Sequence, residues 1–158
     1  MSVVVTGSSC SGNKGNDDFD GEKTNIRRVS FDELLVSADV ISLHVPMNAN
    51  TTHLIDRRAL TRMKRTAFLV NASRGSVVDE NALTWALEEK LIAGAALDVY
   101  ESEPVVQKKL LSLDNVVLAP HLGSATRETR TAMAELAVSN VIAVLSDQEP
   151  LTPVLSKV

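Results

Sequence analysis

Short apolar runs alternate with helical patterns along most of the chain. The runs at 1–6, 39–44 and 92–99, and those that begin at Phe68 and Val116, are rich in β-branched or small residues and are predicted as strands. Several of these runs are apolar almost throughout, a pattern typical of strands buried on both faces. The small residues within 92–99 favour a central strand pressed between helices.

The segments between the runs carry signals for helix starts. Ser30, followed three residues later by Glu33, is a capping-box pattern that opens a brief helix reaching Ala38. Asp56 and Asp79 occupy the cap position before two further predicted helices. These caps divide the first part of the chain into strand–helix repeats.

Two more helices are predicted in the last third of the chain. One is short, at 106–113, and the other is long, at 126–145. Strands that alternate with such helices predict right-handed βαβ units, so the expected fold class is α/β, with a doubly wound parallel sheet covered on both faces. A strand that starts at residue 2 without any lead-in predicts an N-terminally truncated domain. The apolar side of the long helix comprises Met133, Leu136, Ala137, Val141 and Val144.

Composition and charge exclude several classes of protein. The 158 residues carry a net charge of -4, and the basic residues are scattered, which argues against nucleic acid or an anionic membrane as partner. With only Cys10, no intrachain disulfide can form, and no apolar run reaches the roughly 18 residues of a membrane helix. The start of the chain shows no secretory signal, so a cytoplasmic location is expected. The polar segment 7–25 is predicted to be a disordered loop.

Charged and polar side chains follow three of the predicted strands. Arg74 follows the run at Phe68, the acids Glu101 and Glu103 follow the 92–99 run, and His121 follows the run at Val116. Ligands of parallel sheets bind beyond the carboxyl ends of the strands. The sequence therefore predicts a site at this edge that combines a guanidinium, a carboxylate and an imidazole.

These three groups favour one kind of chemistry. An arginine holds a carboxylate in a bidentate pair, so Arg74 suits a substrate acid. His121 can give a proton to a carbonyl oxygen while a hydride reaches the carbon, and Glu103 is available to fix its tautomer. The combination suits reduction of a 2-oxo acid, or oxidation of a 2-hydroxy acid, and leaves the hydride carrier open.

Five segments of the chain form a set with a defined order and spacing. They are His44-Val45-Pro46, Asn71-Ala72-Ser73-Arg74-Gly75, Leu97-Asp98-Val99, Glu103-Pro104 and Pro120-His121-Leu122-Gly123-Ser124-Ala125-Thr126. Together they resemble the D-isomer-specific 2-hydroxyacid dehydrogenases, and the resemblance extends over about 29–154. The ending of the last segment, with Thr129, Arg130 and Met133, resembles the glyoxylate/hydroxypyruvate reductase branch in particular.

The resemblance implies a role for each site residue. Arg74 binds the substrate carboxylate and activates the carbonyl, Glu103, favoured over Glu101, orients the imidazole, and His121 is the acid/base. The resemblance also implies NAD or NADP as cofactor, a small 2-oxo or 2-hydroxy acid as substrate, a homodimer in the complete enzyme, and no metal. The residues implied to line the nicotinamide half are Val45, Pro46, Ala72, Ser73, Arg74, Asp98, His121, Leu122 and Gly123.

The sequence also departs from the family pattern. The glycine-rich phosphate turn that should precede the 1–6 strand is absent, and Gly7-Ser8-Ser9 stands in place of the acid that binds the adenosine ribose of NAD. NADP is therefore possible, although no arginine lies beside this turn. We expect 1–158 to be a partial, Rossmann-like NAD(P)-binding domain, with 126–158 crossing to a substrate domain outside this sequence. The chain alone is expected to be inactive and to self-associate through its last helix.

Three other interpretations of the sequence compete with this one. The segment from Gly7 to Lys14 partly resembles a phosphate-binding Walker loop, but its lysine is one place late and no helix pattern follows. A non-catalytic, dinucleotide-binding protein like the corepressor relatives of the family would use the same fold. The third alternative is a remnant that folds and binds nothing.

Two further side chains receive a structural interpretation. His53 is predicted to face solvent and Trp85 to lie in the core or an interface.

Overall fold

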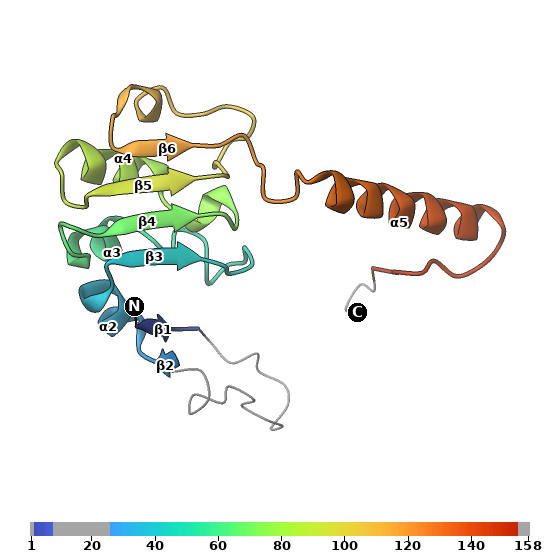
Figure 1. Ribbon diagram of the computed structural model, residues 1–158, viewed down its shortest axis with the longest axis horizontal. Helices are drawn as coiled ribbons and strands as arrows, with labels where there is room; N and C mark the ends of the chain where they lie inside the picture. The colour runs from blue at the N-terminus through green and yellow to red at the C-terminus, as the bar shows by residue number, and fades with distance from the viewer. Residues whose placement is uncertain (1, 8–25, 155–158) are drawn as a thin grey trace. The chain divides into compact units, whose positions relative to one another are not determined.

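The computed structural model describes residues 2–7 and 26–154, so that most of the predicted loop 7–25 lies outside the described residues. The chain forms two compact units, Met1–Pro120 and His121–Val158. Among the described residues, the first unit contains two parallel sheets and three α-helices, and the second contains the long helix (Figure 1). No helix in the described part of the chain is both long and apolar enough to cross a membrane.

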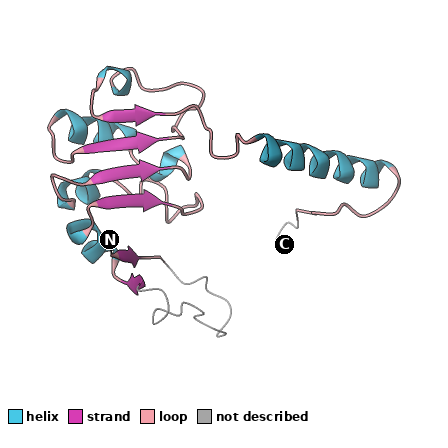
Figure 2. Cartoon of the chain, viewed as in Figure 1, coloured by secondary structure: helices cyan, strands magenta, loops and turns pink. Residues whose placement is uncertain are grey.

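The main sheet has four parallel strands in the order β3-β4-β5-β6 (Figure 2). Each strand pairs with the one that precedes it in the sequence, as βαβ connections predict. The predicted strands are therefore confirmed, with shorter bounds: β3 is Val40–Leu43, β4 is Phe68–Asn71, β5 is Gly94–Leu97 and β6 is Val116–Leu118.

The helices of the first unit begin where the caps predict. Ser30 caps α2 (Phe31–Ser37), Asp56 caps α3 (Arg57–Arg62), and Asp79 caps α4 (Glu80–Glu88). In each case the side-chain oxygen accepts a backbone N–H from the first turn, which satisfies a donor that the helix itself cannot pair. The predicted helix at 106–113 is wrong in extent, because only a 3₁₀ turn, η2 (Leu110–Ser112), forms there.

One face of the main sheet carries the core. In β3 the side chains of Ile41 and Leu43 are buried, while Val40 on the other face is 61% exposed. Phe68 and Val117 share that second face and are also exposed. The prediction of a sheet covered on both faces is thus wrong for the described residues. The reason is topological, because the strand order advances in one direction and right-handed crossovers then place α3 and α4 on the same side.

The remaining strands form a separate, two-stranded parallel sheet. β1 (Val3–Val5) pairs in register with β2 (Ile26–Arg28). The sequence pattern did not predict β2, because two of its three residues are arginines. Its Arg27 forms an exposed ion pair of 2.8 Å with Glu33 on α2, so the small sheet contacts this helix.

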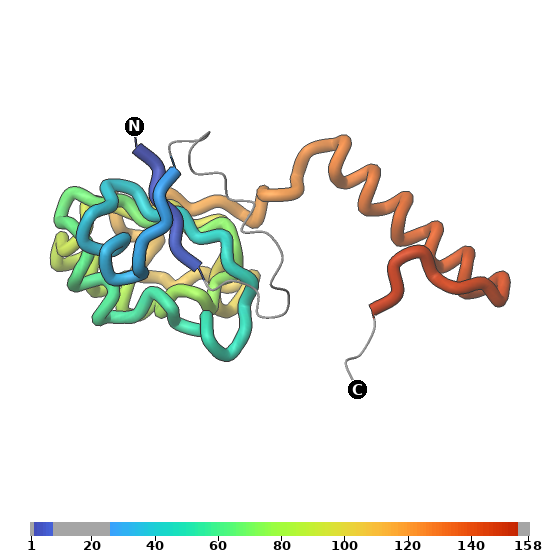
Figure 3. Tube along the Cα trace, turned by 90° about the horizontal axis from the view of Figure 1, so that it is seen from below, coloured from blue at the N-terminus to red at the C-terminus, as the bar shows by residue number. Residues whose placement is uncertain are grey.

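The second unit is built on the predicted long helix, α5 (Arg127–Leu145), which Thr126 caps. After α5 the chain runs back along the helix (Figure 3), and Thr152 exchanges two hydrogen bonds of 3.0 Å with the side chain of Asn140. Most of the apolar side predicted for this helix is exposed, including Met133 at 57% and Val141 at 56%.

Candidate active site

Arg74 stands at the end of a turn that the buried side chain of Asn71 organises. The Asn71 Oδ1 accepts hydrogen bonds from the Ser73 N–H (3.1 Å) and Oγ (2.9 Å), and its Nδ2 donates to the Arg74 carbonyl (3.0 Å). Asn71 is 1% exposed, so these bonds are shielded from water. The turn fixes the backbone of Arg74, whose exposed guanidinium donates from Nη1 to the Ser73 carbonyl at 2.7 Å.

Gly75 lies after the end of β4, and its backbone packs against the loop that follows β5. A Cβ atom at this position would collide with the carbonyl group of Tyr100 and the amide nitrogen of Glu101. Because the φ of Gly75 is not positive, a left-handed backbone does not require glycine here. The close approach of the two backbones does. The segment that carries Arg74 therefore lies directly against the segment that carries Glu103.

The loop after β5 is fixed by Tyr100 and Glu103. Glu103 Oε1 accepts the Tyr100 N–H at 3.0 Å, which holds the carboxylate against its own loop. The Tyr100 hydroxyl donates to the carbonyls of Ala119 (2.8 Å) and Leu97 (3.3 Å), linking the ends of β5 and β6. Burial, followed by the negative charges of Asp98, Glu80 and Glu103, raises the pKa of Tyr100 above 10.0.

Glu101, the alternative to Glu103, makes contacts of its own. Its Oε1 lies 2.7 Å from Nε2 of His53, and the same oxygen accepts the backbone N–H of Glu80 at 3.4 Å. His53 is exposed, as predicted, but it also forms this ion pair, which the sequence reasoning did not foresee. The two neighbouring acids thus have different partners, since Glu103 turns back onto Tyr100.

The predicted nicotinamide-lining residues of the first unit follow neighbouring strands at one edge of the sheet. Val45 and Pro46 follow β3, Ala72 and Ser73 follow β4, and Asp98 follows β5. The Asp98 N–H donates to the Asn71 carbonyl at 2.9 Å, which keeps the last two of these strand ends in register. With Arg74, which directly follows Ser73, six predicted residues therefore share the carboxyl edge of three adjacent strands.

The other predicted residues belong to the second unit. His121, Leu122 and Gly123 are its first three residues, directly after Pro120 in the sequence. His121 has a φ of 55°, in the left-handed region, and the Ala125 N–H donates to the Leu122 carbonyl at 2.9 Å, closing a turn. A left-handed histidine is uncommon and marks a backbone constrained by its surroundings. The meeting of His121 with Arg74 and Glu103 stays a prediction.

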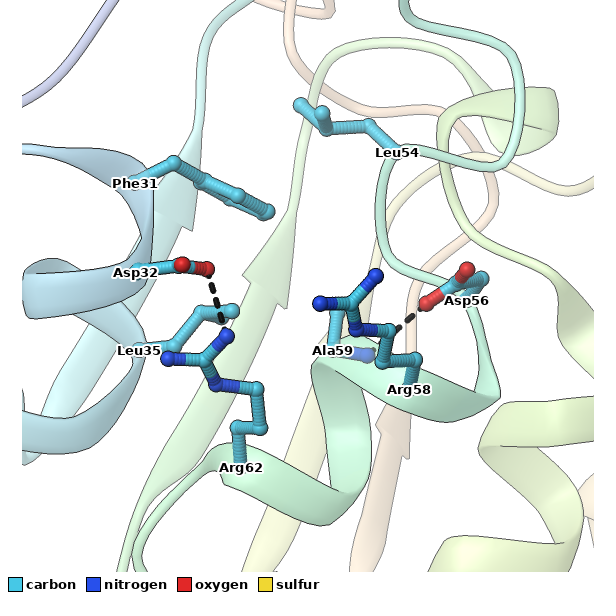
Figure 4. A pocket seen from close by; sticks show the side chains of 8 residues that line it. All are labelled: Phe31, Asp32, Leu35, Leu54, Asp56, Arg58, Ala59 and Arg62. Carbon is cyan, nitrogen blue, oxygen red and sulfur yellow. Dashed lines mark hydrogen bonds and ion pairs between the residues drawn. The ribbon is translucent and has the colours of Figure 1, made fainter.

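A pocket of about 350 Å³ lies between α2 and α3 (Figure 4), and the residues that line it include none of the predicted site residues. Arg62 extends across one side to Asp32, with a 2.7 Å ion pair, while Asp56 is held by its capping bond to the Ala59 N–H. The acids of this pocket are therefore engaged in the structure of the helices. Its lining comprises Phe31, Asp32, Leu35, Leu54, Asp56, Arg58, Ala59 and Arg62.

Sequence reasoning missed three residues that build the site. Tyr100 and Glu80 bond to the loop that carries Glu103, and Asn71 shapes the turn before Arg74. The one usable signal was a polar asparagine within an otherwise apolar strand end, because a buried amide needs hydrogen-bond partners. Nothing in the spacing of Glu80 marks it as different from other acids at a helix start.

Comparisons with known proteins give a consistent result. Residues 2–123 match the protein family described as D-isomer specific 2-hydroxyacid dehydrogenase, NAD binding domain. The chain is 51% identical over 129 residues to a glyoxylate reductase of Thermococcus litoralis. This match covers 82% of this chain and 39% of that protein. It is 50% identical over 128 residues to a glyoxylate/hydroxypyruvate reductase B of Pectobacterium atrosepticum, covering 80% of this chain and 40% of that protein.

A solved structure has a similar fold. An NADPH-dependent glyoxylate/hydroxypyruvate reductase of Sinorhizobium meliloti, in complex with NADP and malonate, superposes with a TM-score of 0.80 at 35% identity. The superposition covers 98% of this chain and 46% of that protein. The chain thus spans about two-fifths of the length of the curated relatives it matches.

Proposed function

The chain belongs to the D-isomer-specific 2-hydroxyacid dehydrogenases, and from that membership we propose that it forms part of an enzyme that reduces glyoxylate or hydroxypyruvate with NAD(P)H. One observation carries the proposal: the backbone of Gly75 abuts Tyr100 and Glu101, which brings the Arg74 turn against the Glu103 loop at the carboxyl edge of the sheet. Ligands of open parallel sheets bind at this edge.

The residues present fit the nicotinamide half of the cofactor. Pro46 and Ala72 are exposed at the ends of adjacent strands, and Val45 and Asp98 are half-buried beside them. Such a mixture of apolar surface and a few polar groups is typical of cofactor sites. We propose that these residues, with Ser73, Arg74, His121, Leu122 and Gly123, hold the nicotinamide and ribose. The glycine-rich turn that would hold the pyrophosphate is not part of this sequence.

We assign the chemistry to three side chains. Arg74 binds the substrate carboxylate and orients the neighbouring carbonyl. When bound, the reduced cofactor supplies a hydride to the carbonyl carbon. The imidazolium of His121 donates a proton to the carbonyl oxygen, which becomes the hydroxyl, and the histidine is left as neutral imidazole; Glu103 stabilises the imidazolium and fixes the tautomer. The histidine then takes a proton from solvent for the next cycle.

The proposal extends to the rest of the complete protein. We propose that 126–158 crosses to the substrate domain, because the exposed apolar side of α5 needs a partner surface. We also propose that the complete protein is a homodimer in the cytoplasm. We further propose that it binds no nucleic acid, which the net charge of -4 and the scattered basic residues support.

A hybrid enzyme tests the function directly. The matched 129-residue segment of this chain replaces its counterpart in the Thermococcus litoralis glyoxylate reductase, and turnover of glyoxylate is followed by the loss of NADH or NADPH fluorescence. We expect Arg74→Ala and His121→Ala to lower kcat/KM by about a hundredfold or more, with a much smaller change in cofactor affinity because the other lining residues remain. Arg65→Ala, at an exposed arginine outside the site, is the matched control. Parental rates in both site variants would refute the assignment.

A further inference from the structure

A buried acid, Glu80, lies beside the loop that carries Glu103. It is the first residue of α4 and is 7% exposed, which is unusual for a glutamate. Its Oε1 accepts the backbone N–H of Glu101 at 2.6 Å, a short, charge-assisted hydrogen bond. The side chain therefore reaches from the start of the helix to the backbone of a loop 21 residues further along the chain.

Glu101 returns the same kind of contact. Its Oε1 accepts the backbone N–H of Glu80 at 3.4 Å, one of the donors that the helix start leaves unpaired. Each glutamate thus bonds to the backbone of the other, and His53 completes the group at 2.7 Å from the Glu101 carboxylate. Three segments far apart in the sequence meet here, and two of them carry Arg74 and Glu103.

The charges of this group are costly. Burial, and then the negative charge of Glu101, raise the pKa of Glu80 above 4.5, while the hydrogen bond from the Glu101 N–H opposes the rise. An apolar side chain of similar size at position 80 would avoid this cost, but it would leave the Glu101 N–H without its acceptor. An acid at position 80 therefore supplies a hydrogen-bond acceptor for the Glu101 N–H, which an apolar residue cannot do.

The acceptor controls one peptide group. The Glu101 N–H belongs to the peptide whose carbonyl, on Tyr100, lies against Gly75. The N–H of Tyr100 itself bonds to the Glu103 carboxylate at 3.0 Å. The Tyr100 N–H and this peptide group are joined at the Tyr100 Cα, and Glu103 follows two residues after Glu101, so displacement of the peptide group would change the geometry of the Tyr100–Glu103 bond.

We propose that Glu80 is a positioning residue for Glu103, acting through the Tyr100–Glu101 backbone, and that it sets where the Glu103 carboxylate lies relative to the Arg74 turn. The proposal rests on the role assigned to Glu103 in the proposed function. Its structural part, the dependence of the Tyr100–Glu103 bond on Glu80, can be measured without any turnover.

The test compares two substitutions of nearly equal volume. Glu80→Gln keeps an oxygen that can accept the Glu101 N–H, whereas Glu80→Met fills the same space without an acceptor. In the 158-residue chain, amide hydrogen exchange at Glu101 and Tyr100 is followed by NMR. We expect Glu80→Met to speed exchange at both amides by about tenfold and Glu80→Gln to leave both rates within about threefold of the parent. An unchanged exchange rate of the Tyr100 amide in Glu80→Met overturns the proposal.

The same pair in the hybrid enzyme tests the consequence for turnover. We expect Glu80→Met to lower kcat by about tenfold with an unchanged KM for the cofactor, and Glu80→Gln to restore most of the rate. Equal kcat values in the two variants overturn the positioning role. If the parental hybrid itself shows no turnover, the proposed function fails, and the exchange rates still decide whether Glu80 holds the loop.

Discussion

The hydroxyl of Tyr100 donates a 2.8 Å hydrogen bond to the backbone carbonyl of Ala119. This bond connects the loop after β5 to the end of β6, two residues before His121 in the sequence. The same tyrosine donates its backbone N–H to Glu103. One residue between two strands therefore contacts the acid of the proposed site and the strand that leads to its histidine.

Replacing this tyrosine by phenylalanine removes the hydroxyl and keeps the ring. We expect Tyr100→Phe to lower the free energy of unfolding by about 1 kcal/mol, because the Ala119 carbonyl loses its donor. Urea unfolding followed by tryptophan fluorescence measures the change. Ser112→Ala removes an exposed hydroxyl that also donates to a carbonyl, and it should cost less than about 0.5 kcal/mol. Equal effects in both variants would contradict the structural role of Tyr100.

The titration of Tyr100 gives a second prediction. It is the single tyrosine of the chain, so phenolate absorbance reports this residue alone. Burial and then the neighbouring acids raise its pKa, so the titration midpoint should lie above 10.0 in the folded chain. Because the folded pKa is the higher one, stability is fully present below pH 10.0 and falls as the pH rises through the folded value. A midpoint at or below 10.0 in folded protein contradicts this prediction.

The carboxyl of Glu80 produces a pH dependence at the acidic end. Burial raises its pKa in the folded chain above 4.5, so the folded state binds the proton more tightly than the unfolded state. The stability that this group contributes is therefore complete below pH 4.5 and is lost as the pH rises through the folded pKa. Glu80→Gln should remove this part of the slope in urea unfolding measured at a series of pH values. His53 and Glu101, the titratable groups beside Glu80, are unchanged in this variant. An unchanged slope would show that Glu80 titrates as it does in the unfolded chain.

Gly75 is expected to tolerate no side chain. Its added Cβ would overlap with the backbone of Tyr100 and Glu101, so Gly75→Ala must push the two segments apart. We expect a loss of about 3 kcal/mol in the free energy of unfolding. Gly7→Ala is the control, because nothing lies within 4 Å of the added atom there, and it should stay within about 0.5 kcal/mol of the parent. A stable Gly75→Ala variant would mean that the two segments are not held together.

The uncovered face of the main sheet predicts self-association of the isolated chain. Val40, Phe68 and Val117 form an exposed apolar surface there, of the kind that drives association. Light scattering over a range of concentrations should show association, and Val117→Lys should reduce it. Val154→Lys, at a residue that is 99% exposed, is the control. Val141→Lys measures how much the exposed side of α5 contributes to the association. A monomer at high concentration would contradict the prediction that the sheet face and the side of α5 drive association.

The local elements could be predicted from the sequence because their signals are local. Ser30, Asp56 and Asp79 mark helix starts, since a cap needs only a side-chain oxygen a few residues from the N–H that it accepts. β2 escaped prediction because its pairing with β1, and not its own composition, makes it a strand. The one-sided burial of the sheet follows from strand order, which no single segment contains.

The sequence by itself determined the strand ends that carry Arg74, Glu103 and His121, because the periodicity of apolar residues and the motif segments are written along the chain. Only the tertiary structure decided that Glu103 bonds to Tyr100 while Glu101 bonds to His53, and that Glu80 reaches the same loop. The physical reason is that these partners are set by backbone contact at Gly75 and by burial, which depend on how separate segments pack. Two acids two residues apart look alike in the sequence, and their surroundings make them different.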